Sequence, residues 1–171
     1  MKKLTCLLLF CILIVTAPAS AQSSEHDLAT IDGVISALYE SISGEKGAER
    51  DWKTFRMLFA DGARLIPTGE NKEGEMTYNF ITPEQYIDTS GPWLVENGFF
   101  EEEIHRETQE FGHMAHIFST YTSRNTKGGE LIARGINSIQ LFNDGKRWWV
   151  MTIYWGNESP ENPIPDQYDK Q

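Results

Sequence analysis

The chain reads RGINSIQLFNDGKRWWVMTIYW from residue 134 to residue 155, and this stretch decides the fold. Two runs rich in β-branched and aromatic residues flank Asn143-Asp144-Gly145. An Asp-Gly pair supplies the positive-φ positions that a tight turn between antiparallel strands needs. The stretch therefore predicts a β-hairpin whose strands cover residues 131–142 and 147–155.

Two more strand-like runs precede the hairpin, over residues 99–111 and 114–124. Turns that contain glycine join the four runs, as expected for strands that pair with their neighbours in sequence. The polar stretch 69–77 is predicted to be a loop. After about residue 157 the chain has no apolar periodicity, and an extended C-terminal arm is predicted there.

Three helix-like segments come before these strands. In the first, apolar residues recur at three- and four-residue steps between Leu28 and Ile42, and Ser24 is its predicted N-cap. The second is predicted to begin near Asp51 and to end at Gly62. A short strand, residues 64–67, is expected to follow it.

The third helix has the clearest start signal. Thr82 is a good N-cap, Pro83 suits the first helical position, and Gln85 stands where a capping box requires it. Gly91-Pro92 is expected to interrupt this helix before a last apolar turn. Helices followed by hairpin-linked strands predict an α+β domain with an antiparallel sheet.

The N-terminus has the three parts of a secretory signal peptide. Lys2 and Lys3 precede an apolar run over residues 4–15, and small residues end at Ala21. The run is too short to cross a bilayer, which takes about 20 helical residues. We therefore expect cleavage after Ala21, an exported protein that is periplasmic or secreted, and one mature domain over residues 22–171.

Both cysteines, Cys6 and Cys11, lie inside the predicted signal peptide. Phe10 is too large for the position before a lipid-modified cysteine, so lipidation at Cys11 is not expected. The mature chain then has no cysteine, which excludes disulfides, thiol nucleophiles and thiolate metal sites.

The mature domain is strongly acidic. Residues 1–21 hold two of the 15 Lys and Arg residues and none of the 25 Asp and Glu residues, which leaves 13 against 25 and a net charge of −12. Nucleic acids and anionic membranes both require clustered basic residues. We therefore expect no nucleic-acid partner, and no membrane partner once the signal peptide is removed.

The two faces of the last strand are both largely apolar. Alternation places Trp149, Met151, Ile153 and Trp155 on one face and Trp148, Val150, Thr152 and Tyr154 on the other. One face covers the helices, and the other needs a cover as well, which indicates a partner subunit or a strongly curved sheet. A homodimer that packs through the sheet is therefore expected.

Several stretches resemble an exported bacterial branch of the nuclear-transport-factor-2-like (SnoaL-like) superfamily. They are HIFSTY at residues 116–121, the stretch 134–150 with Trp155, and the tail from Asn162 to Tyr168. The resemblance implies a cone-shaped fold of three N-terminal helices packed on a curved antiparallel β-sheet, with an open pocket. It does not imply one reaction, because this fold carries many functions.

His116 is the candidate catalytic residue. It is interpreted either as a partly buried histidine that hydrogen-bonds a neighbour or as a proton-transfer group, since histidine titrates near neutral pH. His113 and His116 do not form a metal pair in a strand, because positions three apart face opposite sides. With no thiolate and no third ligand, no metal site is predicted.

Arg106 and Arg134 are candidate ligands for an anionic group. Alternation places Glu101, Glu103, His105 and Glu107 on one face of their strand, and this charged row is expected to be solvated. The two arginines then either enter the pocket, where a guanidinium binds anions through its planar fork, or form cross-strand ion pairs with Glu102 or Glu110.

A further group of residues is interpreted as core that in part lines an apolar cavity: Tyr39, Trp52, Phe55, Trp93, Phe118, Tyr121, Asn137 and Trp155. A core tyrosine is common, yet Tyr39 is able to present its hydroxyl to a pocket. The chain has no Gly-rich phosphate loop and no nucleophile elbow, so no cofactor is expected.

These observations leave three hypotheses for function. The first is an exported pocket protein that binds a small apolar or weakly anionic molecule. The second is a SnoaL-like, cofactor-free acid/base enzyme of the isomerase or dehydratase type, which requires a histidine or carboxylate with a perturbed pKa inside the pocket. The third is a protein-interaction module that uses the sheet face.

Overall fold

A computed structural model describes residues 26–169. The predicted signal peptide, residues 1–21, and the predicted cap Ser24 lie outside the described residues. The described part holds three α-helices, six strands and a short 3-10 helix. They are α1 (Ile31–Ile42), α2 (Trp52–Leu58), β1 (Phe59–Glu70), β2 (Met76–Tyr78), α3 (Pro83–Asn97), β3 (Phe100–Phe111), β4 (Met114–Arg124), β5 (Leu131–Asn143), β6 (Trp148–Asn157) and η1 (Asp166–Tyr168).

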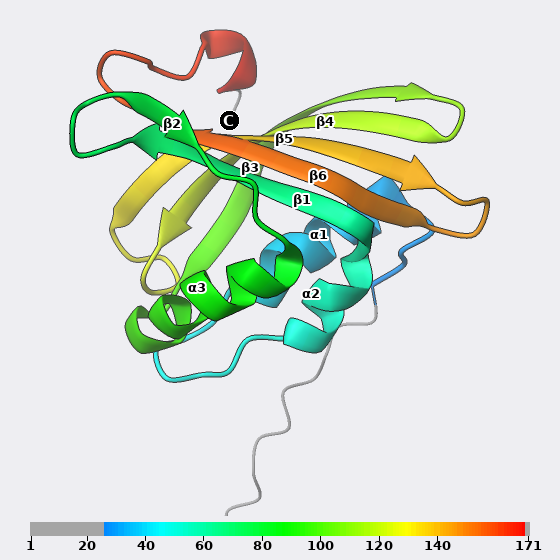
Figure 1. Cartoon of the computed structure of the whole chain (residues 1–171), viewed down its shortest axis with the longest axis horizontal. Coiled ribbons are helices and arrows are strands. Elements are labelled where there is room, and N and C mark those ends of the chain that lie inside the picture. The colour runs from blue at the N-terminus through cyan, green and yellow to red at the C-terminus, as the bar shows by residue number, and fades with distance from the viewer. Residues whose placement is uncertain (1–25, 170–171) are drawn as a thin grey trace, which may run out of the picture.

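The six strands form one sheet in the order β2-β1-β6-β5-β4-β3. The helices lie on one side of this sheet, and the C-terminal arm lies on the other (Figure 1). The α+β class is confirmed. The prediction of a wholly antiparallel sheet is wrong at one pair, because β1 runs parallel to β6 while the other pairs are antiparallel.

The four predicted C-terminal strands are present with nearly the expected bounds, and the turn at Asp144-Gly145 joins β5 to β6. Only Gly145 has positive φ there, at 91°. The Asp144 carboxylate accepts hydrogen bonds from the backbone N–H groups of Lys146 and Arg147 and from Trp149 Nε1. These bonds fix the turn without a left-handed aspartate.

The largest difference from the sequence prediction lies between residues 59 and 78. The predicted helix end and short strand at 64–67 are one long strand, β1, and the predicted loop at 69–77 is largely the hairpin between β1 and β2. Pairing with β6 and β2 supplies the backbone hydrogen bonds of this segment, which local sequence signals do not report.

The capping box of α3 is confirmed, with both the Thr82 and the Gln85 bonds in place. The predicted interruption at Gly91-Pro92 is wrong, because the helix continues to Asn97. Gly91 instead allows a close approach to another helix: a Cβ there would lie 3.0 Å from Cζ2 of Trp52 in α2.

A bulge in β6 explains why the predicted faces of that strand are wrong. Gln140 pairs with Thr152 and Leu141 pairs with Val150, so Met151 is skipped. One extra residue reverses the alternation. Trp148, Val150 and Ile153 are therefore all buried, while Met151 is exposed.

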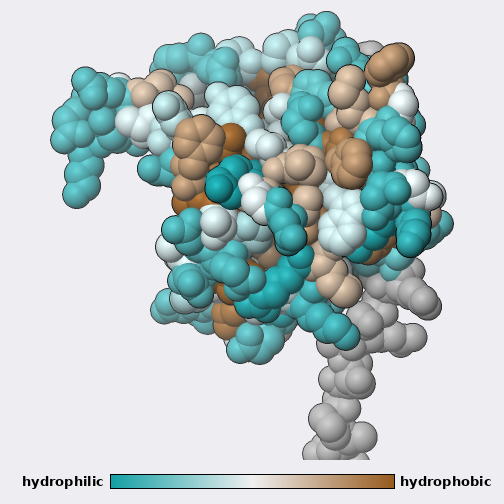
Figure 2. Space-filling model, turned by 45° about the vertical axis from the view of Figure 1, so that its right-hand side comes forward, coloured by the Kyte–Doolittle hydropathy of each residue, from teal (hydrophilic) through white to brown (hydrophobic). Residues whose placement is uncertain are grey.

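The visible surface is mainly hydrophilic. Figure 2 shows hydrophobic side chains in several small groups separated by hydrophilic ones. Single apolar side chains on a surface are normal in soluble proteins and do not by themselves mark a docking site. The homodimer that the sequence indicates stays a prediction.

Arg50 is the one buried cation of the helical layer within residues 26–169, with 4% of its surface exposed. Its guanidinium donates to the carbonyl oxygens of Ile42 in α1 and Leu94 in α3, and to those of Gly44, Glu45 and Ala48 in the loop after α1. A cation is favourable at helix C-termini, where carbonyl groups lack partners. Arg50 thus ties the ends of two helices to one loop.

We predict that Arg50→Ala lowers the free energy of unfolding by about 3 kcal/mol or more, because five backbone carbonyl groups each lose a hydrogen bond from the guanidinium. Urea unfolding followed by tryptophan fluorescence measures this. Arg56→Ala is the matched control, since Arg56 pairs with Glu84 at the surface. Equal losses for the two variants would contradict the role given to Arg50.

Candidate functional site

A cavity of about 340 Å³ lies between the helices and the inner face of the sheet. Its walls come from all three helices and from β1, β3, β4, β5 and β6. The lining residues are Leu38, Tyr39, Ile42, Phe55, Leu65, Tyr86, Ser90, Trp93, Leu94, Phe99, Glu101, Tyr121, Ser123, Ile132, Ala133, Asn137, Ile153, Trp155 and Asn157. Most of these are apolar or aromatic, as is usual for a small-molecule pocket.

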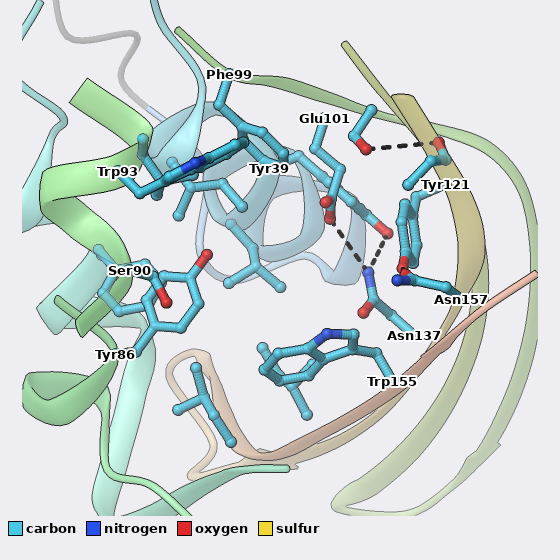
Figure 3. Close-up of a pocket in the computed structure, with 18 of the residues that line it drawn as sticks. Tyr39, Tyr86, Ser90, Trp93, Phe99, Glu101, Tyr121, Asn137, Trp155 and Asn157 are labelled. Atoms are coloured by element: carbon cyan, nitrogen blue, oxygen red, sulfur yellow. Dashed lines mark hydrogen bonds between the residues drawn. The ribbon is translucent and has the colours of Figure 1, made fainter. Parts of the chain in front are cut away.

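The polar groups of the cavity lie on opposite sides. Glu101, Tyr39 and Asn137 meet on one side, and Tyr86 and Ser90 of α3 lie across the cavity from them (Figure 3). Trp155 and Trp93 form parts of the wall between the two sides. A bound molecule would therefore contact polar groups at both ends and aromatic rings between them.

Among residues 26–169, Glu101 is the only acidic residue in this lining. Burial in the apolar surroundings raises the pKa of its carboxyl from an ordinary value of 4.5 to about 7, and one hydrogen bond from Asn137 opposes the rise. Desolvation disfavours the charged form of an acid, which is why the pKa moves upward. At neutral pH this carboxyl group is present in both protonation states.

The expectation that the row beginning with Glu101 is solvated is wrong. Glu101 pairs with Ser123 and Glu103 with Tyr121, and these two β4 residues face the helices. A register shift between Glu103 and His105 then reverses the alternation. Glu101 and Glu103 consequently point inward, whereas strict alternation had grouped them with His105.

A chain of hydrogen bonds leads from Glu101 to the edge of the core. Asn137 Nδ2 donates to Tyr39 Oη over 3.0 Å and, at 3.4 Å, to Glu101 Oε1. Tyr39 Oη and Ser119 Oγ lie 2.7 Å apart, and Ser119 Oγ donates to Glu103 Oε1 over 2.5 Å. Tyr39, Ser119 and Asn137 are all buried.

The direction of each hydrogen bond in this network follows from its last member, Glu103. An ionised carboxylate only accepts, so the single Ser119 proton goes to Glu103. Ser119 must then accept the Tyr39 proton, and Tyr39 must accept from Asn137. The Asn137 amide nitrogen therefore points at Glu101, and the Tyr39 hydroxyl has no proton left for a bound molecule.

The other two tyrosines differ in their availability. The Tyr121 hydroxyl donates to Asn157 Oδ1 over 2.6 Å. Within residues 26–169, no hydrogen bond joins the Tyr86 hydroxyl to another residue, so Tyr86 is free to donate to a ligand. Burial is the main cause that raises the pKa of Tyr39, Tyr86 and Tyr121, which keeps all three neutral at ordinary pH.

Six of the candidate residues from the sequence line the cavity, and five do not. Those in the lining are Tyr39, Phe55, Trp93, Tyr121, Asn137 and Trp155; those outside it are Trp52, Arg106, His116, Phe118 and Arg134. Trp52 lies behind the wall, against Phe55 at 5.7 Å between ring centroids. The polar lining residues that sequence reasoning did not select are Tyr86, Ser90, Glu101, Ser123 and Asn157.

The two arginines form ion pairs outside the cavity, and their partners differ from those expected. Arg106 binds Glu103 and Asp32, both at 2.6 Å. Arg134 lies on the outer face of the sheet and binds Glu158 at 3.6 Å and, at closer range, Asp169. The anion site predicted for these residues does not lie in the cavity, and neither Glu102 nor Glu110 is their partner.

His116 is likewise on the outer face of the sheet. Its Nε2 lies 3.0 Å from Ser138 Oγ, and its ring contacts Phe118 at 6.2 Å between centroids. This position fits the interpretation of a partly buried, hydrogen-bonded histidine. It separates His116 from Glu101, which lies across the sheet.

A second hollow of about 750 Å³ lies between the outer face of the sheet and the C-terminal arm. Phe118 lines it, and Tyr168 of the arm packs on Phe118 with ring centroids 4.9 Å apart. Of its carboxylates, Glu70 and Glu161 are exposed, while Glu158 pairs with Arg134. We therefore place the candidate site in the smaller inner cavity.

Residues 26–169 contain no group of three or more His, Cys, Asp or Glu side chains that could hold a metal ion. No helix in this part of the chain is long and apolar enough to cross a membrane.

No family model and no curated protein matches this chain. Solved structures do match its fold. A protein of unknown function from Mycobacterium tuberculosis superimposes with a TM-score of 0.55 at 13% identity, covering 79% of each chain. A protein with a cystatin-like fold from Nostoc punctiforme also gives 0.55, at 14% identity, covering 79% of this chain and 92% of its own.

A third solved structure carries the name that the sequence suggested. It is a nuclear-transport-factor-2-like protein of unknown function from Silicibacter pomeroyi, with a TM-score of 0.50 at 12% identity, covering 74% of this chain and 92% of its own. The fold is thus shared with nuclear-transport-factor-2-like and cystatin-like proteins. At this identity the likeness shows the fold and says nothing about function.

We predict that Glu101→Gln stabilises the protein at about pH 8 by about 3 kcal/mol and has little effect at about pH 4. The folded protein holds the Glu101 proton up to a pKa of about 7, whereas an ordinary glutamate loses it near 4.5. The folded state therefore binds more protons between these values, and stability falls as pH rises through them. Glutamine has no proton to lose, so it avoids this loss.

Unfolding free energies of the wild type and both variants, measured in urea at the two pH values, test this prediction. Glu102→Gln is the matched control, because the neighbouring Glu102 is exposed. If the unfolding free energies of the wild type and Glu101→Gln differ by the same amount at both pH values, the pKa of Glu101 is not raised and the prediction is wrong.

Proposed function

We propose that this chain is a cofactor-free acid–base enzyme in which Glu101 transfers a proton to or from a small, largely apolar molecule. One observation carries the proposal: a single carboxyl group with a pKa of about 7 faces a cavity whose walls are mostly apolar or aromatic. A general acid or base works best when its pKa lies near the working pH.

The surroundings of Glu101 suit proton transfer in both directions. Asn137 supports one carboxylate oxygen through a hydrogen bond of 3.4 Å, and its orientation is set by Tyr39. Glu101 takes a proton from carbon in one step and returns it to another position in the next, which is the chemistry of an isomerase. The free Tyr86 hydroxyl, across the cavity, is the donor for a substrate oxygen.

We also propose three features that the sequence indicates. They are removal of residues 1–21, export to the periplasm or the exterior, and a homodimer that packs through the sheet. A cone-shaped pocket open at one end, as in the exported bacterial branch of the nuclear-transport-factor-2-like superfamily, is consistent with a cavity bounded by helices on one side and the sheet on the other.

The second candidate is binding without turnover. It is favoured by the Tyr39 and Tyr121 hydroxyls, whose protons are donated within the protein, to Ser119 and Asn157 respectively. This leaves Glu101 as the one titratable side chain of the lining that changes its charge near neutral pH. A binding protein of this kind would hold its ligand but would not exchange the ligand's protons.

We predict that the protein accelerates the ring opening of 5-nitrobenzisoxazole, a neutral aromatic probe for a carboxylate base in an apolar site. The base removes the proton on carbon, the N–O bond breaks, and a nitrile and a coloured phenolate form. The rate should rise with pH through about 7, where Glu101 ionises. Absorbance of the phenolate follows the reaction.

Glu101→Gln should lower this rate by about 100-fold or more, the usual contribution of a positioned base. Glu102→Gln should leave both the rate and its pH midpoint unchanged. If the wild type is no faster than buffer, or if Glu101→Gln keeps the wild-type rate, the enzyme proposal fails and binding without turnover takes its place.

A further inference from the structure

Among residues 26–169, no positively charged side chain lines the cavity. Its nineteen lining residues include one glutamate and no lysine, arginine or histidine. Arg50, the buried cation among residues 26–169, donates all its hydrogen bonds to backbone carbonyl groups. An anionic ligand would meet only the negative charge of Glu101, so the weakly anionic molecule expected from Arg106 and Arg134 does not suit this site.

In the part of the chain that the structure describes, Glu101 has no counter-charge. The causes that act on its pKa are burial and the Asn137 hydrogen bond, and no cationic side chain is among them. An ionised carboxylate has about four sites that accept hydrogen bonds, and Asn137 fills one of them at 3.4 Å. Residues 26–169 supply no other hydrogen bond to this carboxylate, so it can accept from a donor that enters the cavity it lines.

Aromatic rings make up a large part of the wall around this carboxylate. Seven of the nineteen lining residues are aromatic: Tyr39, Phe55, Tyr86, Trp93, Phe99, Tyr121 and Trp155. The faces of aromatic rings are electron-rich and attract cations. An uncompensated carboxylate among aromatic rings is the combination that proteins use to hold organic ammonium groups.

We propose that the ligand of this cavity carries a positive charge and is a protonated amine attached to a small apolar or aromatic body. Its ammonium group donates to Glu101, and its body lies against Trp155 and Trp93. This rests on the proposed function in using the same carboxyl group, but it concerns binding and requires no reaction.

The binding of an amine should be linked to the ionisation of Glu101. The titratable groups that face Glu101 from the neighbouring elements are Tyr39 of α1, Tyr86 of α3 and Tyr121 of β4, with Glu103 further along β3. The tyrosines stay neutral, so the charge of the cavity follows Glu101. A cation favours the ionised form, which means that binding below the pKa releases a proton.

Three probes of one shape test this: benzylamine, benzyl alcohol and benzoate, which are positive, neutral and negative at neutral pH. Calorimetry with the wild type should give the order benzylamine, benzyl alcohol, benzoate from tightest to weakest at about pH 8. Benzylamine affinity should fall about tenfold for each pH unit below the pKa of Glu101, and about one proton should be released per ligand bound there.

Glu101→Gln should weaken benzylamine binding by at least about tenfold and remove its pH dependence, with little effect on benzyl alcohol. Glu102→Gln is the control for net charge and should bind like the wild type. Benzoate binding as tightly as benzylamine, or benzylamine binding that ignores Glu101, would overturn the proposal. Ring opening of 5-nitrobenzisoxazole is scored separately, so failure of the amine proposal and failure of the enzyme proposal give different results.

Discussion

The guanidinium of Arg50 is the constraint on which the cavity depends. It donates to carbonyl groups at the ends of α1 and α3 and in the loop between α1 and α2, and so joins these three segments through one side chain. α1 supplies Tyr39, and α3 supplies Tyr86 and Trp93. Because one side chain bonds to both helices, it helps to set the distance between residues of α1 and α3 across the cavity.

A second constraint sets the polarity of the site. The Glu103 carboxylate, held by Arg106, accepts the Ser119 proton and thereby fixes every donor as far as Asn137. Three buried polar side chains are satisfied by one another, which avoids the cost of an unpaired group in the core. Within residues 26–169, Asn137 is the only hydrogen-bond donor to the Glu101 side chain, so the open hydrogen-bonding capacity of this carboxylate is available to the cavity.

The sequence predicted the α+β class, the hairpin at Asp144-Gly145 and the capping box at Thr82 because these depend on local chemistry. Sequence reasoning failed where one extra residue reverses the alternation between the two faces of a strand. The bulges at Ile104 and Met151 turn Glu101 and Ile153 inward. Bulges leave no periodic signal, so strict alternation placed Glu101 in solvent. The parallel pairing of β1 with β6 is equally invisible, because it joins residues about 90 positions apart.

The raised pKa of Glu101 and its open acceptor sites are two results of one energetic fact. Apolar walls remove water from the carboxylate, and no cation replaces it, so the folded protein holds this charge at a cost to its own stability. A positively charged ligand stabilises the ionised form of Glu101 and so offsets this cost on binding. A neutral ligand binds more favourably when Glu101 is protonated. The cavity therefore discriminates by charge through the same carboxyl group that would transfer the proton, and the two properties change together when that group is altered.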